Sequence, residues 1–190
     1  MVYGDFYKFP NPENAPKNPK EIYGSMKLSS EYIVRGYSKM HNINSVIIRP
    51  SAVYGPTDNN FRVIQKLLSM AMTGKQIVAN NPNNNFLDFT NVKDTALGIT
   101  LATIKKTKNL ETFNITYGKS NSLIKVLNII KKLVGKIDVK INKDNSFYPK
   151  RGSLDIRKAK KILGYNPSYN LEKGIKEYYE YLKFIKNYEG

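Results

Sequence analysis

Short β-branched runs alternate with longer helical segments along this chain, and this alternation constrains the fold more than any other feature. The run at 44–49 contains Val46, Ile47 and Ile48 in succession, which is typical of a buried strand. We expect further strands at 112–116 and 137–141, an extended piece at 86–89 and a strand end at 1–4. The spacing of apolar residues predicts helices over 21–40, 61–72, 91–104, 120–134, 154–163 and 170–187. The pattern as a whole indicates an α/β fold.

Two local features refine this outline. Four prolines make 5–20 a loop, and Pro50 is expected to end the strand at 44–49. The loop at 51–56 then follows the carboxyl end of that strand, where open α/β sheets bind their ligands. In the helix at 21–40, the apolar candidates for the core are Ile22, Met26, Ile33, Val34 and Tyr37.

The glycines are widely spaced, which excludes the usual phosphate cradles. No two of the 12 glycines lie closer than Gly164 and Gly174. A dinucleotide-binding fold places G-x-G-x-x-G in its first βα turn, and a P-loop needs two glycines five residues apart. Neither motif exists in these 190 residues.

Composition removes several classes of site. The sequence has no Cys and a single His, His41, so disulfides, thiolate catalysis and a zinc centre are not expected, and we predict no metal. No apolar run approaches the ~18 residues that cross a bilayer, and residues 1–6 show no secretion signal. These points predict a cytoplasmic protein with no membrane partner.

The net charge of +16 favours an anionic partner. The lysines are spread over most of the chain, however, and no nucleic-acid recognition motif accompanies them. A basic nucleic-acid binder is therefore only a minor alternative. A small anionic substrate such as a diphosphate fits the charge as well.

Tyr23 and Lys27 are four residues apart in a predicted helix, so their side chains leave the same face one turn apart. An ammonium group beside a phenol stabilises the phenolate. A phenolate can exchange a proton with a hydroxyl or carbonyl near neutral pH. The same spacing occurs by chance on many solvated helices, so the pair alone is a weak sign of catalysis.

Six sequence blocks, spread over nearly the whole chain, match one enzyme family in their order and spacing. They are Val2-Tyr3-Gly4-Asp5, Tyr23-Gly24-Ser25-Met26-Lys27-Leu28 with Glu31, Arg49-Pro50-Ser51-Ala52-Val53-Tyr54-Gly55-Pro56, Asp88-Phe89-Thr90-Asn91-Val92-Lys93-Asp94, Lys160-Lys161-Ile162-Leu163-Gly164-Tyr165-Asn166-Pro167 and Leu171-Glu172-Lys173-Gly174-Ile175. Together they resemble the C-terminal part of the NAD-dependent epimerase/dehydratase family, the extended short-chain dehydrogenases/reductases that act on nucleotide sugars.

This resemblance implies roles in catalysis and cofactor binding. Tyr23 would be the acid/base, and Lys27 would stabilise its phenolate and hold the nicotinamide ribose. The loop residues Pro50, Ser51, Ala52 and Val53 would lie against the nicotinamide of NAD. The family oxidises a sugar hydroxyl by hydride transfer to NAD and then reduces or rearranges the keto intermediate.

The resemblance also implies a nucleotide-sugar substrate and residues that bind it. Arg151 matches an arginine that the family uses near the substrate nucleotide, and a guanidinium can grip phosphate with two bonds. Arg62 is a weaker candidate for the same task, Asp88 would shape the substrate-binding part, and Ala52 stands where several relatives have a substrate-binding Asn. From the residues alone, Arg49 and Asp94 pair charges at element ends, Arg62 is solvated and Tyr54 packs.

The implied fold is the C-terminal part of a Rossmann-type doubly wound sheet with a small α/β substrate-binding domain. We expect residues 1–75 to belong to the Rossmann-like part and 76–190 mainly to the substrate domain, with about 86–106 returning to the Rossmann part. The glycine-rich cofactor half and the serine or threonine that bonds the reacting oxygen would lie upstream of Met1. Leu87 stands where many relatives have Arg, so the sugar nucleotide is left undefined.

Two interpretations of function follow. The chain is the acid/base part of an epimerase or dehydratase, which needs a separate N-terminal half or a longer chain to bind NAD and which forms a homodimer through the helix bearing Tyr23. Alternatively, it is an inactive fragment or an interaction module that keeps the substrate-domain fold.

Overall fold

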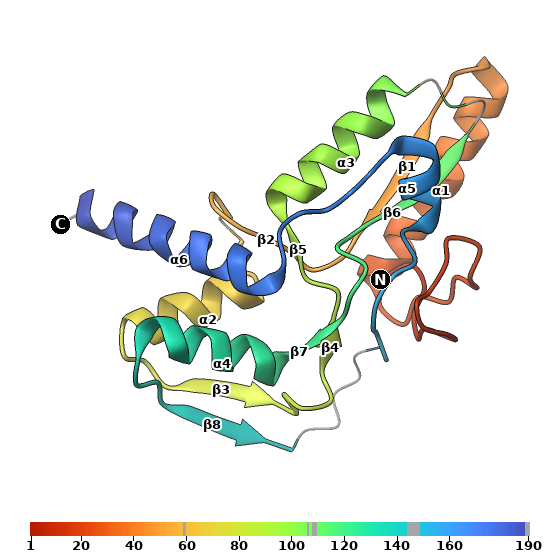
Figure 1. Ribbon diagram of the computed structural model, residues 1–190. Helices are drawn as coiled ribbons and strands as arrows, with labels where there is room; N and C mark the ends of the chain where they lie inside the picture. Colours follow the sequence, from red (N-terminus) through yellow and green to blue (C-terminus); the bar gives the residue numbers. More distant parts are fainter. Residues whose placement is uncertain (59, 106, 108–109, 144–148, 189–190) are drawn as a thin grey trace.

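A computed structural model describes residues 1–58, 60–105, 107, 110–143 and 149–188. Figure 1 shows two lobes, between which the chain passes repeatedly. The elements are α1 (Ile22–His41), β1 (Val46–Pro50), β2 (Val53–Tyr54), α2 (Val63–Met72), β3 (Ile77–Asn80), β4 (Phe86–Leu87), β5 (Thr90–Asn91), α3 (Val92–Ile104), β6 (Glu111–Ile115), β7 (Asn121–Ser122), α4 (Leu123–Val134), β8 (Val139–Asn142), α5 (Arg157–Leu163) and α6 (Leu171–Tyr188).

The first lobe is built on a parallel pair of strands, β1 and β6, in which Val46 lies opposite Glu111 and Pro50 opposite Ile115. Helix α1 lies over one face of this pair. On the other face, Ala102 of α3 and Ala159 of α5 pack with the fully buried Phe113 of β6. Within the described residues, β1 pairs with β6 alone, so its second edge has no strand beside it.

The second lobe packs α2, α4 and α6 around one core. Leu68 of α2, Ile130 of α4 and Ile175 of α6 are all fully buried there. The parallel pair β3–β8 covers one side of this lobe. Between the lobes lie two short pairings, the parallel β2–β5 and the antiparallel β4–β7.

The α/β fold and the order of the main helices are confirmed, and the exceptions have local causes. Residues 1–4 form a turn rather than a strand end. Pro50 is the last residue of β1 rather than a residue beyond it. Proline is tolerated there because an edge strand does not need the N–H group that proline lacks. Helix α5 begins at Arg157 and not at 154, because Leu154 forms a bridge with Asn11. Strand β3 was not predicted.

The prediction for the core face of α1 was wrong. Ile22, Met26 and Ile33 are 81%, 65% and 69% exposed, and the helix buries Gly24, Glu31 and Ser38 instead. The buried residues recur every seven positions, so they form one stripe on the inner side. We call the opposite stripe the outer face of α1; its residues are Ile22, Met26, Ile33, Tyr37 and Met40. Among the described residues, no helix is long and apolar enough to cross a membrane.

Candidate functional site

Tyr23 and Lys27 lie on the flank of α1, between the buried stripe and the outer face. The Lys27 ammonium is 5.6 Å from the centre of the Tyr23 ring. Tyr23 is 56% exposed, so its hydroxyl is accessible to a ligand. The predicted pair therefore exists as a neighbouring phenol and ammonium on one side of a helix.

The loop from Pro50 to Val53 leaves the carboxyl end of β1, as expected. Ala52 has a φ of 38°, a left-handed conformation that is uncommon for a residue with a side chain. Its carbonyl accepts a hydrogen bond from the Thr90 amide at 3.3 Å. This bond and the β2–β5 pairing hold the loop against the start of α3. Tyr54, which follows the loop, packs in the core at 2% exposure.

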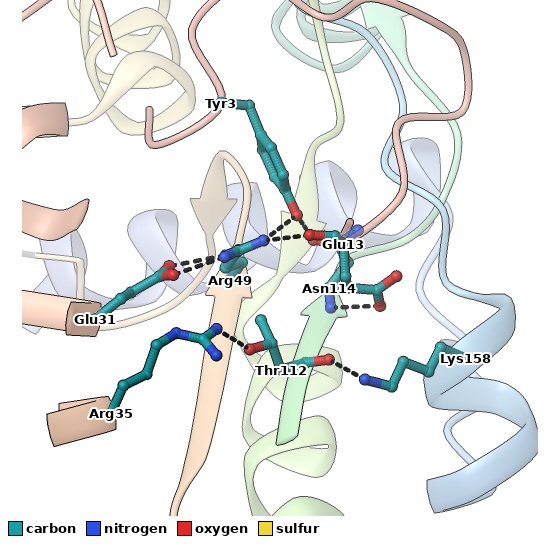
Figure 2. A network of polar contacts seen from close by, with 8 residues as sticks. All are labelled: Tyr3, Glu13, Glu31, Arg35, Arg49, Thr112, Asn114 and Lys158. Carbon is teal, nitrogen blue, oxygen red and sulfur yellow. Dashed lines mark hydrogen bonds and ion pairs between the residues drawn. The ribbon is translucent and has the colours of Figure 1, made fainter. Parts of the chain in front are cut away.

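A buried ion pair joins the helix of Tyr23 to the strand that leads into this loop (Figure 2). Arg49, the residue before Pro50, donates two bonds to the Glu31 carboxylate, at 2.8 and 2.6 Å. Glu31 is one helical turn beyond Lys27. The pair therefore fixes the helix of Tyr23 to the strand before the loop. Arg49 thus pairs its charge at the end of an element, as predicted from the residues alone.

The same guanidinium also holds the N-terminal loop. It donates to the Tyr3 hydroxyl at 2.8 Å and to the Glu13 carbonyl at 2.9 Å. The Tyr3 hydroxyl donates to Asn114 of β6 at 2.7 Å, and the Asn114 amide donates to the Glu13 carboxylate at 3.0 Å. Burial raises the pKa of Tyr3 to about 12, although Arg49 opposes this shift. Tyr3 therefore stays neutral and acts as a bridge.

Two further cations bond Thr112, two residues before Asn114 in β6 (Figure 2). Arg35 of α1 donates to the Thr112 hydroxyl at 3.0 Å, and Lys158 of α5 donates to the Thr112 carbonyl at 2.9 Å. Tyr3, Glu31 and Arg49 belong to the sequence blocks that match the family, but the hydrogen bonds between them were not predicted. The partners are up to 111 residues apart, so no local pattern reveals them.

Arg151 lies on the side of the molecule where α1 begins. Its guanidinium contacts the Met1 sulfur at 3.5 Å. A methyl group added at Gly24 would lie 2.9 Å from the Met1 carbonyl oxygen. Met1 thus touches both the helix next to Tyr23 and the side chain of Arg151. Arg62, in contrast, is exposed at the N-cap of α2 in the second lobe.

Asp88 has no exposed surface. Its carboxylate accepts bonds from the Thr116 hydroxyl at 2.9 Å, the Gly118 amide at 3.2 Å and the Leu154 amide at 3.0 Å. Burial raises the pKa of Asp88 to about 7, against the lowering effect of these donors. Its side chain therefore organises the protein interior at a place that a bound sugar does not reach directly.

A groove of about 590 Å³ runs along the start of α1. Its lining includes Ile22, Met26 and Ile33 of the outer face, together with Pro19 and Ser29. Tyr23 and Lys27 do not line it. Among the described residues, no three His, Cys, Asp or Glu side chains lie close enough together to hold a metal ion.

The residues present fit one end of a dinucleotide. A neighbouring phenol and ammonium, on a helix that the Glu31–Arg49 pair joins to the strand before the loop, suit a nicotinamide and its ribose. The pyrophosphate end has no counterpart, because the sequence contains no glycine-rich turn.

Comparison with known proteins gives consistent matches over nearly the whole chain. The family model described as GDP-mannose 4,6 dehydratase matches residues 1–178. A UDP-glucose epimerase of Bacillus subtilis, itself uncharacterised, is 29% identical over 179 residues, which are 94% of this chain and 56% of that protein.

Two solved structures have the same fold. The UDP-glucuronic acid 4-epimerase of Bacillus cereus, in complex with UDP-glucuronic acid and NAD, is 28% identical with a TM-score of 0.89; the match covers 97% of this chain and 59% of that one. The UDP-glucose 4-epimerase of Thermotoga maritima, with UDP-glucose, is 26% identical with a TM-score of 0.89; the match covers 97% and 61%. The chain therefore spans between 56% and 61% of the length of these three proteins.

Proposed function

Because this chain belongs to the NAD-dependent epimerase/dehydratase family of extended short-chain dehydrogenases/reductases, we propose that it is the acid/base part of a nucleotide-sugar epimerase or dehydratase. The observation that carries the proposal is the arrangement of Tyr23 and Lys27. They are adjacent and accessible, and the Glu31–Arg49 pair fixes their helix to the loop that begins at Pro50.

In this proposal each residue of the chain has a defined task. The Tyr23 phenolate accepts the proton of a sugar hydroxyl and later returns it, while the Lys27 ammonium stabilises the phenolate. The loop from Pro50 to Val53 and the Lys27 side chain would hold the nicotinamide end of NAD. When bound, NAD supplies the hydride acceptor for oxidation of the sugar carbon.

The substrate residues follow the same logic. Arg151 would bind the diphosphate of the nucleotide sugar from its position beside Met1. Arg62, exposed at the N-cap of α2, is the weaker candidate for the same task. Ala52 lies in the loop that would face the nicotinamide, and it would contact the sugar there. The net charge of +16 supports an anionic substrate of this kind.

We further propose that the chain is the C-terminal part of the enzyme, with residues 1–75 in the Rossmann-like part and 76–190 mainly in the substrate part. The cofactor cradle then comes from a separate N-terminal half or from a longer chain. Two surfaces support such a partner. The second edge of β1 has no strand partner among the described residues, and the outer face of α1 exposes apolar side chains.

The outer face of α1 also favours the second candidate, a catalytically inactive fragment or interaction module that keeps the substrate-domain fold. Ile22, Met26 and Ile33 are spaced for contact with another helix. This candidate and the enzyme share the same fold, and they differ in whether ligands bind near Tyr23.

Calorimetry on the isolated chain tests whether it binds the substrate nucleotide but needs a separate cofactor half to bind NAD. We expect no micromolar binding of NAD, because the pyrophosphate has no helix N-terminus with a glycine-rich turn. We expect measurable binding of UDP, through Arg151. Micromolar NAD binding would overturn the need for a separate cofactor half, and absence of UDP binding would favour the interaction module.

A further inference from the structure

Asp88 lies where the chain passes between the two lobes. The segment that holds it connects β4 to β5, the turn at Thr116–Lys119 connects β6 to β7, and the segment ending at Leu154 leads towards α5. Its carboxylate accepts one bond from Leu154 and two from the turn, namely from Thr116 and Gly118. One buried side chain thus joins three segments that come from different parts of the sequence.

The segment at Leu154 is the one that carries Arg151. Beyond the bond to Asp88, its backbone pairs with Asn11 on both sides: the Asn11 amide donates to the Ser153 carbonyl, and the Asp155 amide donates to the Asn11 carbonyl, each at 2.9 Å. The Leu154 amide faces away from that ladder, towards Asp88. Asp88 is therefore the anchor on the interior side of this segment.

We propose that Asp88 is a positioning residue, which fastens the segment carrying Arg151 to the turn at Thr116–Lys119 and so sets where the Arg151 guanidinium lies relative to Tyr23. This inference rests on the proposed function, in which Arg151 binds the substrate diphosphate. It replaces a direct substrate contact for Asp88, which its complete burial excludes.

The chemistry of the site requires an acceptor at both oxygens. One oxygen faces the Gly118 amide, and the other faces Thr116 and Leu154. An Asn side chain would direct its NH2 group at one of these donors, because an amide accepts at one atom only. The site therefore distinguishes a carboxylate from its isosteric amide.

Few other ionisable groups act on this carboxylate. Tyr165 lies nearby, and its hydroxyl donates to the Thr116 carbonyl at 3.1 Å. Tyr117 and Lys119 lie in the turn, and Arg151 and Asp155 lie in the Leu154 segment. Arg157 lowers the pKa of Asp155, whereas burial raises that of Asp88 to about 7. Asp88 is thus the carboxyl of this cluster that titrates near neutral pH.

The test uses Asp88→Asn, with Asp138→Asn as the matched control, since Asp138 is an exposed carboxylate bonded to Gln76. In the wild-type chain, the NMR signals of the Gly118 and Leu154 amide protons should move with one shared midpoint as pH changes from 5 to about 8, because both bond the same carboxyl group. Asp138→Asn should keep this titration and Asp88→Asn should abolish it. If Asp88→Asn fails to fold, Thr116→Val removes one donor and should raise the shared midpoint.

Binding of UDP then tests the consequence for Arg151. We expect the affinity to fall roughly tenfold in Asp88→Asn, the size of losing one well-placed charged hydrogen bond, and to stay unchanged in Asp138→Asn. Unchanged UDP affinity in Asp88→Asn would overturn the positioning role, as would amide signals that titrate independently of Asp88. Failure of the wild-type chain to bind UDP would instead overturn the proposed substrate, while the shared titration would still decide whether Asp88 holds the segment.

Discussion

Glu31 and Arg49 keep only 10% and 5% of their side chains exposed, and this burial makes the pair sensitive to the loss of either partner. Arg49 bonds both oxygens of the Glu31 carboxylate, and Tyr3 and Glu13 accept two further bonds from the same guanidinium. A charge left alone in such a place is far more costly than a charge at the surface.

Glu31→Gln should therefore lower the free energy of unfolding by about 3–5 kcal/mol, because Arg49 stays charged and buried. The measurement is urea unfolding followed by circular dichroism. The matched control is Glu177→Gln, which breaks the half-exposed pair with Lys93 and should cost less than about 1 kcal/mol. If both variants lost less than about 1 kcal/mol of unfolding free energy, the buried pair would contribute no more to stability than a surface pair.

Asp88 should give the chain a distinctive dependence of stability on pH. The folded state raises its pKa from the ordinary 3.8 to about 7, so between these values the folded chain keeps a proton that the unfolded chain has lost. The contribution of Asp88 to the free energy of unfolding is therefore fully present at low pH, and it is lost as pH rises to about 7.

Unfolding of wild type and Asp88→Asn at a series of pH values isolates this contribution. Their difference in unfolding free energy should fall between pH 4 and about 7 and level off above it. A difference that is constant with pH would mean that Asp88 does not change its protonation there.

At the scale of elements, helix positions could be predicted from the sequence, but the contacts of each face could not. The inner stripe of α1 is polar at Glu31 because Arg49 meets it from β1, and a helix examined alone gives no sign of that partner. Strand β3, whose partner β8 lies about sixty residues away, was missed. The two-residue strands β2 and β7 are too short to show any pattern.

Helix α6 contains a contact that makes an ordinary substitution harmful. A methyl group at Gly174 would lie 2.0 Å from the hydroxyl oxygen of the buried Tyr54. Gly174→Ala should therefore destabilise the chain by about 1–3 kcal/mol, as overpacking does. At Gly36 in α1 nothing lies within 4 Å, so Gly36→Ala should stabilise by up to about 1 kcal/mol. Thermal unfolding compares the two, and a stabilising Gly174→Ala would contradict the packing between α6 and Tyr54.

At the scale of the whole molecule, the sequence motifs pointed to Tyr23, Lys27 and the loop after β1, and the Glu31–Arg49 pair joins the helix of the first two to the strand that leads into the loop. The remaining parts of the candidate site depend on long-range contacts. Met1 contacts Arg151, and Asp88 contacts Leu154, although the partners lie 150 and 66 residues apart in the sequence. Such contacts depend on how the lobes pack, so residue spacing does not reveal them.

The central claim is that these residues are the acid/base part of a nucleotide-sugar enzyme, and joining the chain to a cofactor half tests it most directly. The chain would be fused behind the cofactor-binding part of the Bacillus cereus epimerase. Conversion of UDP-glucuronic acid and of UDP-glucose to product would then be followed by chromatography, because the hydride returns to the sugar in each cycle and reduced nicotinamide does not accumulate. We predict turnover that Tyr23→Phe lowers roughly 10²- to 10⁴-fold, while Tyr37→Phe, on the outer face of the same helix, leaves it unchanged. A folded fusion that is inactive, or equally active with Tyr23→Phe, would contradict the claim.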